Sequence, residues 1–488
     1  MNDVTSPTTV DHRARVPWLA ALLSFAFPGL GHLYAARWRL AAAFGIPMAV
    51  LVAVIGLAWL DVIDVRPSAL LSTRFLVFVL VVNGAVMVWR AVAIAHAGLT
   101  PRGEVVGAQR RNATIAAVLL VLATIVMHVW VAVVIVNLER TLSEVFGGLN
   151  PGVEQPNESP GPTLAPGVTP TPVPPAWNGT EVINVLLLGT DETPERDAVL
   201  TDVILAVSIN PVAETAVMVS IPRDTGFLPL PDRSIYSDGL YPDKVNSLYA
   251  RAANAPSVWC PDIPEDPNAC GLRTIETAVG LYLGIEIDHY ALVDMSGFAD
   301  LIDALGGLEL CLPGQLVDPN FDGTLENAGA DGSLVLPAGC THYDGLSALA
   351  FARSRQGWIE LPDGTRDDQN DFDRNERQQE LLLAMREELA EADTFLELPG
   401  ILSAIADTVS TDFPRDQAGE LASLLPLIAG PDIHRLVLSY PEYVDLPIDP
   451  SANYLLIPRR DAIRGAMEDL FGADELEGWY LATEDLGP

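Results

Sequence analysis

The sequence is nearly devoid of lysine and lacks the signatures of several enzyme classes. Lys244 is the one lysine in 488 residues. Residues 181–488 contain three histidines, His289, His342 and His434, with neither HExxH nor CxxC spacing, which argues against a zinc site. The chain has no GxSxG nucleophile elbow and no P-loop. These absences exclude the zinc hydrolases, elbow-type serine hydrolases and P-loop nucleotidases.

Charge is distributed unevenly along the chain. Residues 181–488 have 17 Lys and Arg against 55 Asp and Glu, a net charge of −38, whereas residues 1–180 have 11 against 9, a net charge of +2. A region this acidic repels diffuse polyanions, which argues against nucleic acid as a partner. Any phosphate bound there must be held by individual guanidinium groups, which match phosphate oxygens bidentately.

Long hydrophobic runs fill the N-terminal region. Residues 38–60, 75–97 and 113–137 are each long enough to cross about 30 Å of hydrocarbon. An earlier apolar stretch, residues 16–34, is broken by Pro28, Gly29 and Gly31, so it is either a fourth span or a re-entrant half-helix. The connections between spans are flanked by arginines: Arg37, Arg39, Arg90, Arg102, Arg110 and Arg111. The positive-inside rule places these connections in the cytoplasm, so everything after Asn137 is expected outside the cell.

Residues 146–180 are rich in proline, glycine and threonine, which is typical of an extended spacer. At about 3.1 Å per residue, roughly 35 extended residues reach on the order of 100 Å. We therefore expect a multi-pass membrane region at 1–145, a linker at 146–180 and an external domain at 181–488.

All four cysteines lie in the expected external domain, where an even number in an oxidising compartment indicates disulfides. The favoured pairing is local, with Cys260 joined to Cys270 and Cys311 joined to Cys340. The sequence leaves the other two connectivities open. If the cysteines are paired, none of them is a nucleophile.

Strand and helix patterns alternate in the acidic region. Residues 183–189, 202–210 and 215–221 are continuous apolar runs rich in β-branched residues, as in strands buried on both faces. Residues 272–283, 296–305 and 374–392 have apolar positions at helical spacing. Strands covered on both faces by helices predict a three-layer α/β/α sandwich.

Charged residues stand at the ends of the three expected strands. Asp191 follows the first, Asp202 opens the second, and Arg223 with Asp224 ends the third. Adjacent parallel strands would bring such ends together, where ligands of open α/β sheets bind. Each residue also has an ordinary explanation, as a turn former, a helix cap or a structural ion pair.

Arginines are concentrated in one short segment. Five of the sixteen arginines of the acidic region lie within residues 353–377, and Arg374 and Gln378 share one helix face with Arg377 beside them. They are either an anion site or a solvated network with the six acids between Asp363 and Glu376. Arginines, one lysine and strand-end acids suit phosphoryl transfer with a divalent metal.

Five blocks in order resemble the LytR-CpsA-Psr family of wall-assembly proteins across about residues 182–472. They are NVLLLGTD…LTDVILAVSIN, VSIPRDT, DKVNSLYA, DHYALVDMSGFADLIDALGGLELCL and AGCTHYDGLSALAFARSR…DFDRNERQQ. The resemblance implies a phosphotransferase that moves a glycopolymer from a polyprenyl pyrophosphate carrier to a peptidoglycan hydroxyl. It also implies Mg²⁺, release of polyprenyl phosphate, and an apolar tunnel for the polyprenyl chain.

The resemblance also implies roles for individual residues. Asp191 and Asp202 match the metal carboxylates. The pyrophosphate-binding arginines match Arg223, Arg353, Arg355 and Arg374, while Lys244 and Gln378 match the remaining polar positions. Beside them, we expect Arg196, Arg377 and Asp224 to contribute to substrate binding.

The chain departs from the family pattern in two places. The family usually has an arginine two residues before the aspartate of the second strand, where this chain has Leu200. Either Arg196 replaces that arginine, or the pyrophosphate is bound by one guanidinium group fewer. A single membrane anchor is also more usual. Two other interpretations stay open: a hydrolase of the lipid pyrophosphate, and a non-catalytic envelope binding or regulatory protein.

Overall fold

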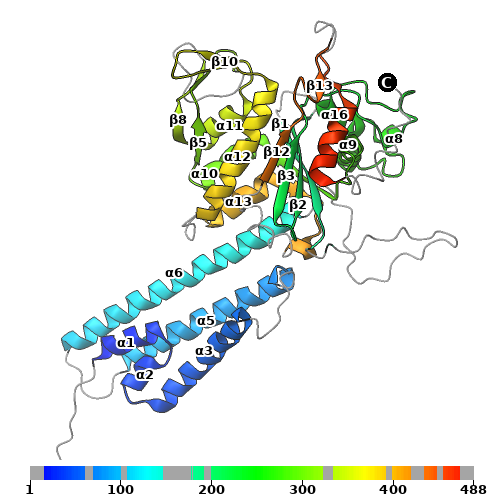
Figure 1. Ribbon diagram of the computed structural model, residues 1–488. Helices are drawn as coiled ribbons and strands as arrows, with labels where there is room; N and C mark the ends of the chain where they lie inside the picture. Colours follow the sequence, from blue (N-terminus) through cyan, green and yellow to red (C-terminus); the bar gives the residue numbers. More distant parts are fainter. Residues whose placement is uncertain are drawn as a thin grey trace, which may run out of the picture. The chain divides into compact units, whose positions relative to one another are not determined.

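The chain forms two compact units, Met1–Glu139 and Arg140–Pro488 (Figure 1). The structure is a computed structural model that describes residues 16–60, 70–100, 107–146, 177, 180–191, 199–321, 333–391, 398–418, 433–447 and 454–472. The boundary between the units falls inside a helix. Most of the linker expected at 146–180 lies outside the described residues.

The first unit is entirely helical in its described part. Its helices are α1 (Pro17–Ala26), α2 (Leu30–Tyr34), α3 (Trp38–Trp59), α5 (Thr73–Leu99) and α6 (Gly107–Val145). By length and composition, α3, α5 and α6 can each cross a membrane. The stretch at 16–34 instead folds as two short helices, because Gly29 at the break has a left-handed φ of 98°. The described residues thus contain three helices of spanning length.

Some polar side chains inside this unit form contacts between helices. His32 of α2 is fully buried and its Nε2 lies 2.9 Å from Nδ1 of His96 on α5. Asn83 of α5 donates to the backbone oxygen of His128 on α6 at 2.9 Å. Such contacts are expected where apolar helices offer polar side chains no water.

A six-stranded mixed sheet forms the centre of the second unit, in the order β11-β4-β1-β2-β3-β12. Its strands are β1 (Ile183–Asp191), β2 (Leu200–Asn210), β3 (Thr215–Ser220), β4 (His289–Asp294), β11 (Val409–Thr411) and β12 (Ile433–Val437). The three apolar runs expected as strands are β1, β2 and β3. The inner strands are rich in Val, Ile and Leu because helices cover both faces.

The relative direction of these strands differs from the expectation. Strand β2 runs antiparallel to both β1 and β3, so the parallel arrangement expected from the sequence is wrong. The charged ends still meet, because Asp191 closes β1, Asp202 lies near the start of β2, and Arg223 follows the end of β3. An up-down-up order places all three at one edge of the sheet.

Helices cover both faces of this sheet and confirm the three-layer α/β/α sandwich (Figure 1). One face packs on α7 (Leu248–Ala253), α8 (Pro256–Trp259), α9 (Pro267–Leu283) and α16 (Arg460–Phe471), with Leu186, Val219 and Ile275 in the largest core cluster. On the other side lie α10 (Met295–Ala304), α11 (Gly345–Arg353), α12 (Asp371–Glu391) and α13 (Leu398–Thr408). Helices α9, α10 and α12 occupy the three regions expected to be helical.

Short sheets flank the α10–α13 layer. Strands β5 (Leu308–Leu312) and β8 (Gly339–Tyr343) form a two-stranded ladder, and β6 (Gln315–Asp318), β7 (Leu334–Leu336), β9 (Trp358–Glu360) and β10 (Arg366–Asp368) form a four-stranded one. Another two-stranded ladder joins β13 (Val444–Asp445) to β14 (Ile457–Pro458). Two 3₁₀ turns, Val245–Ser247 and Arg415–Gln417, complete the described elements.

Both close cysteine pairs match the favoured local pairing. Cys260 and Cys270 connect the end of α8 to the first turn of α9, with a sulfur–sulfur distance of 2.03 Å. Cys311 and Cys340 stand opposite each other on β5 and β8, with their sulfurs 1.99 Å apart. In this geometry neither pair leaves a thiol for chemistry.

We predict that the purified protein has no free thiol until it is both reduced and unfolded. Peptide mapping should then recover Cys311 linked to Cys340, and Cys260 linked to Cys270. Because a closed loop of about 30 residues contributes about 3–4 kcal/mol in the chain-entropy model, reduction should lower the melting temperature. A peptide that links Cys260 to Cys311 or Cys340 would contradict the pairing.

Glu276 of α9 has a buried carboxyl group with a raised pKa. Burial, with Asp412 and Asp288 nearby, raises the pKa of this carboxyl from 4.5 to about 8. Between these two values the folded protein binds a proton that the unfolded chain has released, so the stability of the folded state falls as pH rises through this window.

We therefore expect Glu276→Gln to melt higher than the wild-type protein at pH 8 and to depend less on pH between 5 and 8. Thermal unfolding followed by circular dichroism at both pH values measures the difference. Glu286→Gln, at an exposed position, is the matched control and should change neither value. Parallel pH profiles for wild type and Glu276→Gln would refute a buried proton at this position.

Candidate active site

A local irregularity between β1 and β2 places the first carboxylate of the site. Gly189 is opposite Val203 whereas Thr190 is opposite Thr201, so Asp202 is an extra residue in β2, a β-bulge. Bulges re-aim side chains and are common beside active sites. Gly189 is required here, because a Cβ atom at this position would lie 2.8 Å from the Cβ of Val203.

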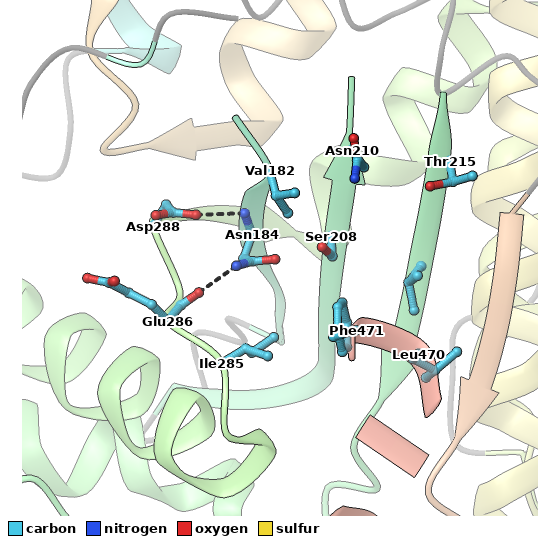
Figure 2. Close-up of a pocket in the computed structure, with 11 residues that line it drawn as sticks. Val182, Asn184, Ser208, Asn210, Thr215, Ile285, Glu286, Asp288, Leu470 and Phe471 are labelled. Carbon is cyan, nitrogen blue, oxygen red and sulfur yellow. Dashed lines mark hydrogen bonds between the residues drawn. The ribbon is translucent and has the colours of Figure 1, made fainter. Parts of the chain in front are cut away.

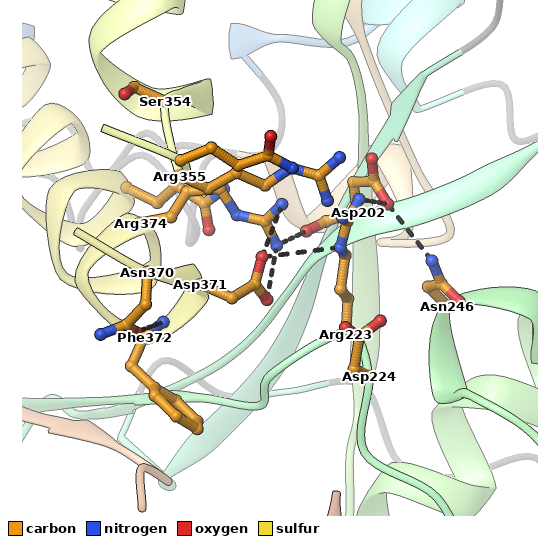
Figure 3. Close-up of polar contacts among 12 residues, drawn as sticks. Asp202, Arg223, Asp224, Asn246, Ser354, Arg355, Asn370, Asp371, Phe372 and Arg374 are labelled. Carbon is orange, nitrogen blue, oxygen red and sulfur yellow. Dashed lines mark hydrogen bonds and ion pairs between the residues drawn. The ribbon is translucent and has the colours of Figure 1, made fainter. Parts of the chain in front are cut away.

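Asp202 pairs with the arginine that follows β3. Arg223 Nη1 lies 2.9 Å from Asp202 Oδ1, and Asn246 Nδ2 donates to the same oxygen at 3.3 Å (Figure 3). Burial by itself would raise the pKa of Asp202, but Arg223 and Arg374 outweigh it and hold the pKa below its ordinary value. Asp202 is therefore ionised at neutral pH.

The first turn of α12 adds a second carboxylate and a second arginine. Arg374 is only 3% exposed; its Nη1 lies 3.1 Å from Asp371 Oδ1, and its Nη2 donates to the backbone oxygen of Asp202 at 3.3 Å. Arg223 Nε lies 3.7 Å from the same Asp371 oxygen. Asp202, Arg223, Asp371 and Arg374 thus form one chain of alternating charge.

Asp371 was not among the residues expected from the sequence. It belongs to the acids that could equally be a solvated network, yet burial raises its pKa in spite of Arg374 and Arg223. The available signal was its spacing, three residues before Arg374 in DFDR, which places both side chains on one helix face.

Arg355 reaches the same place from a loop. Figure 3 shows its guanidinium beside that of Arg374 and facing Asp202. The loop is fixed by Asp318, which is 1% exposed and whose Oδ2 accepts hydrogen bonds from Ser354 Oγ at 2.8 Å and from the backbone nitrogens of Arg355 and Gln356 at 3.2 Å. One buried carboxylate therefore orients the loop that carries Arg355.

Arg377 and Gln378, farther along the arginine segment, are turned toward the protein. Arg377 is 4% exposed and donates to the backbone oxygens of Phe351 and Ser354 and to Gln369 Oε1. Burial lowers its pKa to about 10. The Nε2 of Gln378 donates to the backbone oxygen of Ala352 at 3.4 Å. Both side chains donate to backbone oxygens of residues 351–354, at the end of α11 and the start of the loop that leads to Arg355.

Lys244 lies next to the segment that carries Arg223 and Asp224. Its Nζ is 2.9 Å from Asp224 Oδ1 and 5.9 Å from the centre of the Tyr454 ring. Backbone bonds from Asn246 to Arg223 and from Val245 to Thr225 hold the two segments together. The lone lysine is thus an immediate neighbour of the charge chain.

Two of the expected residues are not fully described. Asp191 ends β1 opposite Leu200, so its backbone lies at the same edge as Asp202, but its side chain is outside the described part. Arg196 lies in the segment 192–198, outside the described residues. The question of whether Arg196 replaces the arginine missing at Leu200 stays a prediction.

The carboxylates at this edge fit a divalent cation. Oxygen ligands are what Mg²⁺ prefers, and it commonly binds through one or two carboxylates together with substrate phosphates. Asp371 Oδ1 is buried and accepts no hydrogen bond within the described residues, although two guanidinium groups approach it. Asp202 and Asp371 are therefore oxygen donors that could share a cation with a phosphate.

A family model matches the part of the chain that holds this site. The LytR_cpsA_psr family model matches residues 162–456, which include every residue of the site. The chain belongs to the LytR_cpsA_psr family. This confirms the resemblance expected from the five sequence blocks.

Individual relatives are distant. The chain is 30% identical to polyisoprenyl-teichoic acid–peptidoglycan teichoic acid transferase TagU of Halalkalibacterium halodurans over 49% of this chain and 64% of the relative. It is 30% identical to cell wall biosynthesis protein LcpA of Corynebacterium glutamicum over 46% and 39%, respectively. Each match thus spans less than two thirds of the relative. Among solved structures, Bacillus subtilis TagV is 22% identical, with a TM-score of 0.42, over 59% of this chain and 97% of TagV.

Proposed function

We propose that this protein is a membrane-anchored phosphotransferase that moves a glycopolymer from a polyprenyl pyrophosphate carrier to a hydroxyl group of peptidoglycan. One observation carries the proposal. Although residues 181–488 have a net charge of −38, Arg223, Arg355 and Arg374 converge on one edge of their sheet. Family membership and the name of the relative TagU, a teichoic acid transferase, support the same activity.

The charge chain supports binding of an anion by a unit that is acidic as a whole. Asp202 and Asp371 hold Arg223 and Arg374 in place before substrate arrives, so little side-chain entropy is lost on binding. A pyrophosphate that approaches this edge meets three guanidinium groups and Lys244. Fixed donors of this kind stabilise the charge that develops on phosphoryl oxygens in the transition state.

In the proposed reaction an acceptor hydroxyl attacks the phosphorus that carries the glycan, and polyprenyl phosphate leaves. Asp202 with Asp191 or Asp371 would hold Mg²⁺, which would neutralise phosphate oxygens when bound. The arginines position the two phosphates, and Asp318 positions Arg355 through its loop. These residues act by orientation and electrostatics rather than by covalent chemistry.

The polyprenyl chain requires an apolar surface next to this edge. Between the sheet and α12, Val203, Leu205 and Met218 form a buried cluster, and several partly buried apolar side chains pack against it. They include Leu187, Met295, Leu382 and Leu383. We assign the lipid chain to this cluster, because α12 also carries Arg374 at its start.

The proposed location follows from the helices of the first unit. Three helices of spanning length precede the acidic unit, and arginines flank their connections. The positive-inside rule then orients residues after α6 to the outer face, where peptidoglycan lies. A multi-pass anchor with an external catalytic unit is thus part of the proposal.

We predict that Arg355→Ala abolishes transfer while the protein remains folded. The side chain is partly exposed and makes no ion pair within the described residues, so its removal costs little stability but removes a contact to the pyrophosphate. The assay follows transfer of a radiolabelled glycan from a synthetic polyprenyl pyrophosphate donor to isolated peptidoglycan.

Arg366→Ala is the matched control, because it removes the same charge from exposed strand β10. It should transfer like the wild type. Wild-type turnover by Arg355→Ala would contradict the assignment. Release of glycosyl phosphate at an equal rate without peptidoglycan would instead identify a hydrolase, and donor binding with no product in either assay would identify a binding protein.

We further predict that Asp202→Asn raises the Mg²⁺ concentration needed for half-maximal transfer by about tenfold or more, since one carboxylate charge is lost. The free protein should bind Mg²⁺ weakly and bind it tightly only with a polyprenyl pyrophosphate analogue, which calorimetry measures. Glu387→Gln, a 70% exposed position on α12, is the control. Tight Mg²⁺ binding without the analogue would place the metal elsewhere.

A further inference from the structure

A cavity lies at the edge of this sheet opposite the arginine edge. Its volume is about 340 Å³, within the range of about 300–1,000 Å³ usual for small-molecule sites. It is lined by the start of β1, the end of β2, the start of β3, the 285–288 loop and the last residues of α16 (Figure 2). Asp191 lies seven positions after Asn184 on β1, so at about 3.3 Å per residue the two edges are about 23 Å apart.

Polar side chains form the floor of this cavity at positions where the sheet would ordinarily be apolar. Asn184 is directly opposite Ser208, which in turn is opposite the apolar Val217 of the core cluster, and Asn210 is opposite Thr215 in the next row. One row inward on the same face, Leu186, Ala206 and Val219 belong to the core cluster. The face therefore changes from apolar to amide and hydroxyl groups where the cavity begins.

Hydrogen-bonding capacity remains in this floor. Asn184 Nδ2 donates to the backbone oxygen of Glu286 at 2.8 Å, which fixes the amide. Asn184 Oδ1 is buried and has no hydrogen-bond partner within the described residues. Figure 2 shows it pointing away from Glu286, toward Ser208. A buried acceptor without a partner is unfavourable, and a ligand hydroxyl that donates to it would remove this cost.

The walls restrict the charge of any ligand. Among the described lining residues the charged groups are the carboxylates of Glu286 and Asp288, and there is no lysine, arginine or histidine. An anion is therefore repelled, in contrast to the arginine edge. Phe471, Leu470 and Ile285 supply an apolar wall. Amide, hydroxyl and carboxylate groups beside an aromatic ring suit a ligand with several hydroxyls and one apolar face.

We propose that this cavity binds an uncharged sugar ring of a glycan. Asn184, Ser208 and Thr215 exchange hydrogen bonds with its hydroxyls, and Phe471 packs against its apolar face. The inference does not rest on the proposed transfer reaction, because it uses none of the residues at the arginine edge.

The test measures binding of chitotetraose, a neutral sugar oligomer, to the full-length protein in a detergent without a sugar headgroup. Calorimetry should detect binding to the wild type. Thr215→Val keeps the side-chain shape but removes a hydroxyl, so it should weaken binding about three- to tenfold. Thr277→Val removes a hydroxyl from α9 outside the cavity and is the control. Phe471→Ala should weaken binding at least as much, with exposed Leu446→Ala as its control.

Other outcomes separate the alternatives. Arg355→Ala should bind chitotetraose like the wild type, so failure of the transferase assignment leaves this result intact. No binding of chitotetraose, or loss of binding in Arg355→Ala, would overturn the proposal. Binding of a glucosamine tetramer alone, abolished by salt, would also overturn it, because that result reflects general attraction of a cation to an acidic protein.

Discussion

The chain of alternating charges from Asp202 through Arg223 and Asp371 to Arg374 is the interaction on which the active edge depends. Its members come from three places: Asp202 from a bulge in β2, Arg223 from the segment after β3, and Asp371 with Arg374 from the first turn of α12. Removing one member of a buried ion pair leaves an uncompensated charge, which typically costs about 3–5 kcal/mol. The network therefore couples the sheet to α12 as well as positioning guanidinium groups.

Such a network is a poor way to gain stability, since desolvation of buried charges offsets much of their attraction. Its retention is better explained by the geometry it enforces. Arg374 is 3% exposed, and burial lowers its pKa, yet its Nε has no hydrogen-bond partner within the described residues. A guanidinium with unused donor capacity, held by the Asp371 carboxylate and the backbone oxygen of Asp202, suits an anion that arrives later.

Sequence reasoning succeeded where a local pattern determines the structure. Continuous apolar runs predicted β1, β2 and β3, and helical spacing predicted α9, α10 and α12. It was wrong about strand direction, because an apolar run buried on both faces reads the same in parallel and antiparallel sheets. The bulge at Asp202 was also invisible, since it depends on how two strands pair.

The sequence also did not predict which way individual side chains of the arginine segment point. Arg355 and Arg377 are chemically identical and lie on the same short stretch, yet one faces the charge chain and the other donates to backbone oxygens inside the fold. What separates them is the loop fixed by Asp318, a residue far from them in sequence and with no motif of its own. Composition identified the segment, but only tertiary contacts could divide its residues.

The two edges of the sheet also show how so acidic a region can offer an anion site at one edge and a site that repels anions at the other. A net charge of −38 is a long-range property that salt screens over about 10 Å, whereas recognition depends on groups within a few ångströms. At one edge, the four cations Arg223, Arg355, Arg374 and Lys244 outnumber the described carboxylates of Asp202, Asp224 and Asp371; at the other, the described lining residues include two carboxylates and no cation. Opposite local charge at the two ends of the same strands means that a ligand carrying phosphate at one end and neutral sugar rings farther along would meet a favourable surface at each.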